Sequence, residues 1–386
     1  SMERRKCQAK MEWPSLPSSD TGSSPPEEST STLRLRSTSR PADAVTPADE
    51  LAGRLGIEDE QLAPVIRRYP MRITPGYLRL VEAPGDPIWR QCIPDPAELC
   101  DDQQADPLHE ERLSPVPGLI HRYPDRVVWV VSGECAVYCR FCMRKRQVGC
   151  MVSRHSEDPF SEPLRYISET PAIRDVILSG GDPLLLDDEQ LEEILARLAA
   201  IPHVEMVRIG TRTPVTLPER ITARLCRMLK RYHPLYVNTH FNHPREVTAE
   251  AAKACARLAD AGIPLGNQSV LLAGVNDDPA VMTRLMQLLL SIRVRPYYIH
   301  QMDLVRGTGH FRTPVATGLE ILTALRGNTS GMATPHYVID APGGKGKIPL
   351  LPDCVSRRGD LWLLRTYTGE TIEYRDVGQP ATVLPG

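Results

Sequence analysis

Residues 175–209 read DVILSGGDPLLLDDEQLEEILARLAAIPHVEMVRI, and this stretch decides the fold. Its two ends are short apolar runs with β-branched residues, DVILS (175–179) and VEMVRI (204–209). Between them, LEEILARLAA (191–200) repeats its apolar residues at helical spacing. Two strands joined through a helix usually lie parallel in one sheet. The stretch therefore predicts one strand–helix–strand unit of an α/β protein.

The same unit recurs on both sides of this stretch. Further strand-like runs are VVWVV (127–131), LYVNT (235–239), LGNQSVLL (265–272) and RPYYIHQ (295–301). Further helix-like segments are ERITARLCRMLKR (219–231), AAKACARLADAG (251–262) and AVMTRLMQLLLS (280–291). The alternation predicts a partial (β/α)6 TIM-like barrel with a parallel sheet inside and helices outside. In such a barrel, active residues lie at the carboxyl ends of the strands.

The rest of the chain is expected to flank this barrel. Residues 1–45 are rich in Ser, Thr and Pro and can bury little apolar surface, so disorder is expected there. A cap-like Thr46 starts a first helical pattern, and a second helix is expected over 58–68 before a Pro-rich connector. We expect four regions: a disordered segment (1–45), a helical wrapping extension (46–120), the barrel (121–315) and a C-terminal segment (316–386). The C-terminal segment is expected to contain a helix (318–326), a strand (336–340), a glycine-rich turn and a tail hairpin (361–376).

Composition excludes several classes of protein. The 46 basic and 48 acidic side chains nearly balance, which argues against a nucleic-acid partner. Apolar runs stay well short of the ~18 residues of a membrane helix, so no membrane partner is expected. The start also lacks the pattern of a secretory signal, and a cytoplasmic location is therefore expected.

Four of the ten cysteines crowd together directly after the first strand of the barrel. Cys135, Cys139 and Cys142 are spaced so that three thiolates can hold three irons of a 4Fe–4S cluster. The open fourth iron can then chelate S-adenosylmethionine, whose reductive cleavage releases a carbon radical. The alternative is zinc with Cys150 as the fourth ligand, but intervals of three, two and seven residues fit zinc sites poorly. Cys150 is then a bystander.

Two glycine-rich turns accompany the cysteines. Ser179, Gly180, Gly181 and Asp182 end the second strand, where glycines let the backbone approach a ligand closely. The turn DAPGGKGK (340–347) lacks the phosphate-binding-loop pattern but carries Lys347. A lysine on such a turn can bind pyridoxal 5′-phosphate covalently, although this motif alone also fits a surface loop.

From about Arg72 to Pro349 the chain resembles the lysine 2,3-aminomutase family, a branch of the radical S-adenosylmethionine enzymes. The segments that carry the resemblance are DPLHEERLSPVPGLIHRYPDRV (106–127), CRFCMRKR (139–146), LSGGDPL (178–184), NTHFNHP (238–244), GNQSVLLAGVND (266–277), HFRTP (310–314), LRGNTSG (325–331) and DAPGGKGKIP (340–349). The resemblance implies a radical S-adenosylmethionine barrel and an intramolecular aminomutase, which is an isomerase. It implies three cofactors: the 4Fe–4S cluster, S-adenosylmethionine and pyridoxal 5′-phosphate.

The resemblance also assigns residue roles. Lys347 would hold pyridoxal phosphate, and Arg144 would pair with the substrate carboxylate. The remaining assignments are Arg122, Tyr123 and Arg126 for pyridoxal phosphate, Asp303 and Asp340 for the distal cation of the substrate, and His240 and Gln268 together with Ser179, Gly180, Gly181 and Asp182 for S-adenosylmethionine. His300 is a departure, because some lysine enzymes carry Tyr at this place.

The activity implied is transfer of the α-amino group of L-lysine to the β-carbon. Asp303 and Asp340 suit a basic amino acid and would repel glutamate. Arginine, or lysine destined for attachment to elongation factor P, remains an alternative substrate, and a non-catalytic iron–sulfur or zinc protein is the alternative of another class. Expected partners are a small basic amino acid and an electron donor such as flavodoxin or ferredoxin, and a homo-oligomer is compatible with the family.

Overall fold

The structure is a computed structural model that describes residues 59–101, 103–149, 158–359 and 361–375. The segment expected to be disordered, the first expected helix and Cys150 lie outside the described residues. Within the described part, no helix is long and apolar enough to cross a membrane.

A nine-stranded sheet forms the centre of the molecule, with its strands in sequence order. The strands are β1 (Leu119–Tyr123), β2 (Arg126–Ser132), β3 (Asp175–Gly180), β4 (Met206–Gly210), β5 (Leu235–Thr239), β6 (Leu265–Leu271), β7 (Arg295–Gln301), β8 (His336–Ala341) and β9 (Gly346–Leu350). Strands β2 to β8 are parallel, whereas β1 and β9 pair antiparallel at the two edges. The backbone N–H of Lys347 on β9 donates to the Tyr123 hydroxyl on β1 over 2.8 Å, so the two edges nearly close a barrel. The predicted α/β barrel is confirmed. The strand expected over 336–340 joins the same sheet as β8, and the edge strands β1 and β9 were not expected.

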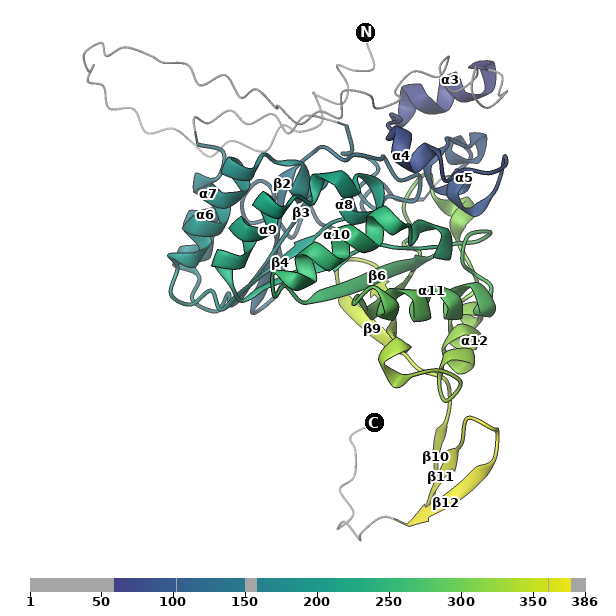
Figure 1. Cartoon of the computed structure of the whole chain (residues 1–386). Helices are drawn as coiled ribbons and strands as arrows, with labels where there is room; N and C mark the ends of the chain where they lie inside the picture. The colour runs from purple at the N-terminus through teal and green to yellow at the C-terminus, as the bar shows by residue number, and fades with distance from the viewer. Residues whose placement is uncertain (1–58, 102, 150–157, 360, 376–386) are drawn as a thin grey trace, which may run out of the picture.

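Helices cover the outside of the sheet (Figure 1). They are α6 (Ser161–Glu169), α7 (Asp188–Ala199), α8 (Thr213–Thr216), α9 (Ala223–Leu229), α10 (Ala249–Asp260), α11 (Pro279–Ser291) and α12 (Val315–Leu325). The side chains of Asp187, Thr248 and Asp278 accept backbone N–H bonds and thereby start α7, α10 and α11. The helix predicted over 219–231 is shorter than expected, because Thr222 caps a new start after a 3-10 turn. Helix α6 was not expected.

Burial alternates along the strands in a way that gives the barrel two different faces. On β4, for example, Val207 and Ile209 are buried in the core that also contains apolar residues of α7, α9, α10 and α11. The intervening Arg208 is only half-buried, as are the alternate residues of β2, β3 and β6. The apolar set therefore packs under the helices, and the partly polar set faces the inside of the barrel.

The N-terminal extension lies against one end of the barrel (Figure 1). It consists of short elements, α3 (Asp59–Arg68), α4 (Pro75–Leu78), α5 (Pro87–Cys92) and a 3-10 helix (Pro96–Leu99). Proline at the first position of α4, α5 and the 3-10 helix explains why these elements begin where they do. The carbonyls of Arg72 and Gln91 accept from the backbone N–H groups of Tyr138 and Arg140, both over 2.9 Å. The extension therefore fixes the loop that carries the cysteines.

The last described residues form a three-stranded antiparallel sheet that projects away from the barrel (Figure 1), with Tyr367 of its hairpin turn lying against Gly327. Strands β11 (Leu361–Arg365) and β12 (Thr371–Arg375) form the hairpin that the sequence predicts, and β10 (Val355–Arg358) pairs with the other side of β11.

A buried ion triad joins the extension to the cysteine loop. The Glu98 carboxylate is fully buried and lies 2.5 Å from Arg140 Nη2 and 2.8 Å from Lys145 Nζ. Burial works to raise the pKa of Glu98, but the charges of Arg140 and Lys145 outweigh it and hold that pKa below its usual value. Since Arg140 lies between Cys139 and Cys142, the triad is a structural support of the loop.

Glu98→Gln should destabilise the fold strongly, because it leaves two cations buried without their counter-ion. We expect the free energy of unfolding to fall by about 3–5 kcal/mol, measured by urea denaturation. Glu205→Gln is the matched control, since Glu205 pairs with Arg174 on the surface and its loss should leave the unfolding midpoint unchanged. Equal midpoints for the two variants would contradict a supporting role for the triad.

Candidate functional site

Three loops after β2, β3 and β4 meet around the cysteines. Cys135, Cys139 and Cys142 carry free thiols, and the Cys142 N–H donates to the Cys139 carbonyl over 3.2 Å in a tight turn. Burial raises the pKa of Cys142 to about 11 and that of Cys135 well above its usual value. Such thiols lose their protons when cationic iron compensates the charge, so the donor set fits an iron–sulfur group.

The glycine turn after β3 packs against the start of the cysteine loop. The N–H groups of Gly181 and Asp182 donate to the carbonyls of Ser132 and Glu134, each over 2.6 Å. A Cβ atom at Gly180 or Gly181 would overlap these same carbonyls. The glycines are therefore needed for the close approach of two loops, a reason that the motif alone did not reveal.

Asp182 is buried and its carboxylate is already engaged. It accepts from the Thr211 hydroxyl over 2.6 Å, from the Arg212 N–H over 2.8 Å and from the Leu184 N–H over 3.1 Å. Burial raises the pKa of Asp182, although these hydrogen bonds oppose the shift. Asp182 therefore ties the end of β3 to the end of β4.

Arg144 has a partner that sequence reasoning missed. Its guanidinium forms a two-point ion pair with Glu110, with Nη2–Oε1 at 2.7 Å and Nε–Oε2 at 3.0 Å. Its third nitrogen donates to the Ser179 hydroxyl over 3.1 Å. Burial works to lower the pKa of Arg144, but the charge of Glu110 outweighs it and raises that pKa above its usual value. Arg144 is thus held beside the β3 glycine turn.

Lys347 lies in a cluster of charges at the other side of the site. Its Nζ is 2.6 Å from Asp340 Oδ2, while Arg122 Nη1 lies 3.1 Å from Asp340 Oδ1. Burial works to raise the pKa of Asp340, but a hydrogen bond from His300 and the charge of Lys347 hold it well below its usual value. Asp340 is therefore ionised and paired with cations.

The surroundings of Lys347 fit pyridoxal phosphate. Arg122 Nε is buried without a hydrogen-bond partner among the described residues, so one donor is left for an acidic ligand. Arg126 lies over the Tyr123 ring, 3.7 Å from its centroid, and Tyr123 also accepts the Lys347 N–H. A free donor, a second arginine and an amine in one place match a phosphate-bearing aldehyde.

Asp303 is the second carboxylate of this cluster. Burial raises its pKa to about 7, and the charge of Asp340 adds to the shift. The charge of Glu110 also raises the pKa of Asp303, whereas the charges of Lys347 and Arg122 lower it. Among the described residues, the Asp303 side chain has no hydrogen bond or ion pair. Asp303 is therefore a carboxylate that would gain from a cationic ligand.

His300 and Gln268 continue the cluster toward the inside of the barrel. His300 Nδ1 lies 3.3 Å from Asp340 Oδ2, and its Nε2 lies 3.0 Å from Gln268 Oε1. Burial lowers the pKa of His300, so the neutral ring has one N–H to give. The carboxylate of Asp340 can only accept, which places the single proton on Nδ1. The unprotonated Nε2 then requires the Gln268 amide to present its NH2 group there in place of Oε1.

His240 and Arg212 lie between the two halves of the site. His240 Nε2 is 3.1 Å from Asn242 Oδ1, and burial together with the Arg212 charge lowers the pKa of His240 to about 3. Arg212 Nη1 donates to Cys139 Sγ over 2.9 Å. The sequence alone does not identify Arg212 or Glu110 as site residues, because Cys139 lies 73 residues from Arg212 and Arg144 lies 34 residues from Glu110.

Comparisons with known proteins identify the family of the chain. Residues 129–286 match the family model described as the radical SAM superfamily, and residues 322–382 match the one described as lysine-2,3-aminomutase. The chain is 51% identical to "L-lysine 2,3-aminomutase" of Fusobacterium nucleatum, over 85% of this chain and 79% of that protein. It is 52% identical to the protein of the same name from Clostridium subterminale, over 85% of this chain and 80% of that protein.

A relative with another substrate in its name is almost as similar. The "Glutamate 2,3-aminomutase" of Clostridioides difficile is 48% identical, over 87% of this chain and 81% of that protein. Overall identity therefore does not separate the substrates. The radical SAM match implies a 4Fe–4S cluster and S-adenosylmethionine, and the length and identity of the matches show that this chain is an isomerase of the lysine 2,3-aminomutase family.

Proposed function

We propose that this protein moves the α-amino group of a basic amino acid, L-lysine in the first place, to the β-carbon. The observation that carries the proposal is the pair of carboxylates, Asp303 and Asp340, beside Lys347. Asp340 is now neutralised by Lys347 Nζ at 2.6 Å. Once that amine is bonded to pyridoxal phosphate, the two carboxylates would keep only one neighbouring cation, Arg122 at 3.1 Å from Asp340, and in this poorly solvated place they would need a second cation. The distal ammonium group of lysine supplies it.

The remaining residues would hold the cofactors and orient the substrate. Lys347 would hold pyridoxal phosphate, with Arg122, Tyr123 and Arg126 at its acidic groups. Cys135, Cys139 and Cys142 would hold the 4Fe–4S cluster, and the groups proposed for S-adenosylmethionine are Ser179, Gly180, Gly181, Asp182, His240 and Gln268. When bound, the cluster and S-adenosylmethionine supply a radical that removes a hydrogen atom from the β-carbon, and pyridoxal phosphate carries the amino group during its shift.

Arg144 would fix the orientation of the substrate. Its Nη1, now on the Ser179 hydroxyl, and its ion pair with Glu110 hold the guanidinium at the β3 end of the site. A substrate carboxylate bound there and an ammonium bound at Asp303 and Asp340 would be fixed at both ends. Such two-point binding keeps the β-carbon in one position relative to the radical.

An anaerobic assay of the reconstituted enzyme tests this function. Lysine, arginine, glutamate and alanine are offered separately with S-adenosylmethionine, pyridoxal phosphate and a reductant, and β-amino acid products are measured by mass spectrometry. Lysine should give the highest kcat/KM, and a preference for arginine would move the assignment to a guanidinium, which two carboxylates can also bind. A preference for glutamate would contradict the argument from the carboxylate pair.

The titration of Asp303 should appear in the pH dependence of this assay. Since burial and Asp340 raise the pKa of Asp303 to about 7, protonation below that pH removes one negative charge from the cation site. We expect kcat/KM for lysine to fall roughly tenfold per pH unit below 7, the slope of a single proton. Asp303→Asn should lower kcat/KM at pH 8 and flatten the profile. An unchanged slope in Asp303→Asn would assign the titration to another group.

A further inference from the structure

Arg212 follows β4 directly and has no role in the function proposed above. Its side chain is only 8% exposed, yet it carries a full charge. Its Nη1 points at Cys139 Sγ over 2.9 Å, a short distance for a bond from nitrogen to sulfur. A buried guanidinium directed at one thiol of a cysteine cluster needs an explanation.

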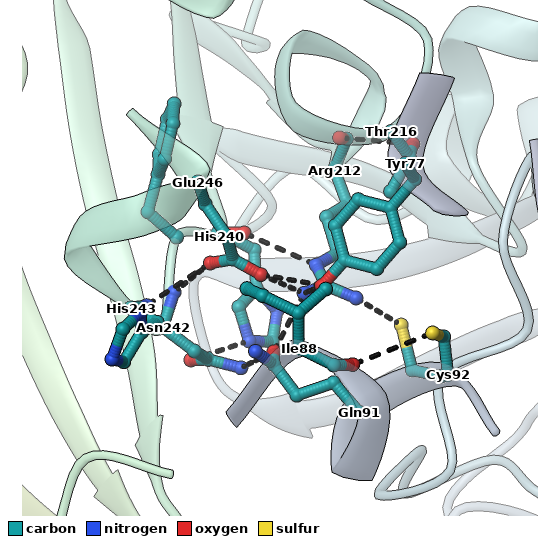
Figure 2. A network of polar contacts seen from close by, with 12 residues as sticks. Tyr77, Ile88, Gln91, Cys92, Arg212, Thr216, His240, Asn242, His243 and Glu246 are labelled. Carbon is teal, nitrogen blue, oxygen red and sulfur yellow. Dashed lines mark hydrogen bonds and ion pairs between the residues drawn. The ribbon is translucent and has the colours of Figure 1, made fainter. Parts of the chain in front are cut away.

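The other two nitrogens of the Arg212 guanidinium donate to oxygen atoms (Figure 2). Its Nη2 donates to Glu246 Oε1 at 2.6 Å, Gln91 Oε1 at 2.7 Å and Tyr77 Oη at 3.0 Å. Its Nε donates to the His240 carbonyl over 3.3 Å. The guanidinium plane is therefore fixed on one side, and Nη1 has no freedom to turn away from Cys139.

Glu246 neutralises the charge of Arg212 through Nη2, while Nη1 of the same guanidinium keeps its hydrogen bond to the Cys139 sulfur. The Glu246 carboxylate is fully buried, and its second oxygen accepts the N–H groups of Asn242 at 2.6 Å and His243 at 3.1 Å. Glu246 Oε1 also accepts the Tyr77 hydroxyl proton over 2.6 Å. The carboxylate is fully hydrogen-bonded, so the pair is stable as a unit and its positive end faces Cys139.

We propose that Arg212 is a positioning residue that raises the reduction potential of the iron–sulfur centre through Cys139. The inference rests on the proposed role of Cys139 as a cluster ligand. When a one-electron donor of the flavodoxin or ferredoxin class reduces the centre, one electron enters, no proton moves and Arg212 stays a guanidinium. The added negative charge is stabilised by the hydrogen bond and by the nearby cation in a poorly solvated place. The reduced state therefore gains more than the oxidised state.

The N-terminal extension takes part in this arrangement. Tyr77 on α4 and Gln91 on α5 both accept from Arg212, and the Gln91 carbonyl also accepts the N–H of Arg140 in the cysteine loop. The extension thus holds Arg212 and the loop in a fixed relation to each other. This explains why polar side chains from so distant a segment are buried at the end of β4.

A redox titration of the reconstituted full-length enzyme tests the proposal. The variant is Arg212→Met, which removes the donor, and its charge-balanced companion is Arg212→Met/Glu246→Gln, in case the single variant does not fold. Arg208→Met is the matched control, since Arg208 lies on the same β4 strand in a two-point ion pair with Asp175, at 2.6 and 3.0 Å. Iron content, and the fraction of reduced cluster by electron paramagnetic resonance, are measured at set potentials.

We expect Arg212→Met and the double variant to keep their iron and to be harder to reduce. At the potential where the unmodified enzyme is half reduced, the ratio of reduced to oxidised cluster should be roughly tenfold lower, as loss of a charged hydrogen bond predicts. Arg208→Met should not change the ratio. An unchanged ratio in an iron-loaded Arg212 variant overturns the proposal. Loss of iron from both Arg212 variants also overturns it, because Arg212 would then be required for binding the cluster and not for setting its potential. Absence of iron from the unmodified enzyme would instead refute the cluster assignment itself.

Discussion

Replacing Lys347 by alanine is expected to abolish amino-group migration, with a fall in kcat of roughly 10³-fold or more, as for loss of other covalent catalytic groups. Lys347 Nζ is the amine that lies within the cluster formed by Asp340, Arg122 and His300. The fold should survive, because Arg122 still neutralises Asp340 at 3.1 Å. Borohydride treatment followed by peptide mass spectrometry should fix pyridoxal on Lys347 in the unmodified enzyme and on no lysine in the variant.

Two controls separate covalent attachment from charge. Lys345→Ala changes an exposed lysine on the same turn and should leave both the labelling and the rate unchanged. Lys347→Arg keeps a cation for Asp340 but cannot bond the cofactor, so it should be as inactive as Lys347→Ala. Labelling of Lys345 in either Lys347 variant, with activity retained, would move the anchor by two residues.

The barrel could be predicted from the sequence because its signals are local. Runs such as DVILS and VEMVRI are short, apolar and separated by helices, and the structure places them in β3 and β4. The two antiparallel edge strands gave no such signal. β1 contains His121, Arg122 and Tyr123, whose polar side chains do not resemble a buried strand, and only one of the five residues of β9 is buried. Pairing with a neighbouring strand, rather than burial, makes these residues a strand.

The positions of the site residues were predictable in outline and their contacts were not. The cysteine spacing and the two glycine turns are motifs within a few residues, so they are visible in one sequence. Glu110, Arg212 and Glu98 contact residues that lie 34, 73 and 42 positions away along the chain. The sequence around a charged loop residue does not indicate which distant residue it contacts. These three side chains orient the residues that the motifs identify.

Removing one thiol of the cysteine loop is expected to have the second of the two largest effects. Cys142→Ala should lower the iron content after reconstitution to a small fraction of that of the unmodified enzyme, because the remaining thiols offer two ligands where a cluster of this kind needs three. Reductive cleavage of S-adenosylmethionine to 5′-deoxyadenosine should then fall below detection in the presence of dithionite. Both quantities can be measured on the same sample.

The controls for Cys142→Ala decide what kind of centre the loop binds. Cys226→Ala removes a buried thiol from α9 and should change neither iron nor cleavage. Cys150→Ala discriminates between iron and zinc: a zinc site with four thiolates would lose its metal, whereas a cluster held by three would not. Iron retained in Cys142→Ala but lost in Cys150→Ala would overturn the ligand assignment.

Comparison with the Arg212 variants gives the final distinction. Cys142 and Arg212 both contact Cys139. The Cys142 N–H donates to the Cys139 carbonyl over 3.2 Å, and Arg212 Nη1 donates to the Cys139 sulfur over 2.9 Å. A ligand is required for the metal to be present, whereas a hydrogen-bond donor to a ligand changes the energy of the electron that the metal accepts. Loss of iron in Cys142→Ala, together with retained iron and harder reduction in Arg212→Met, is therefore the pair of results that assigns each residue its own role.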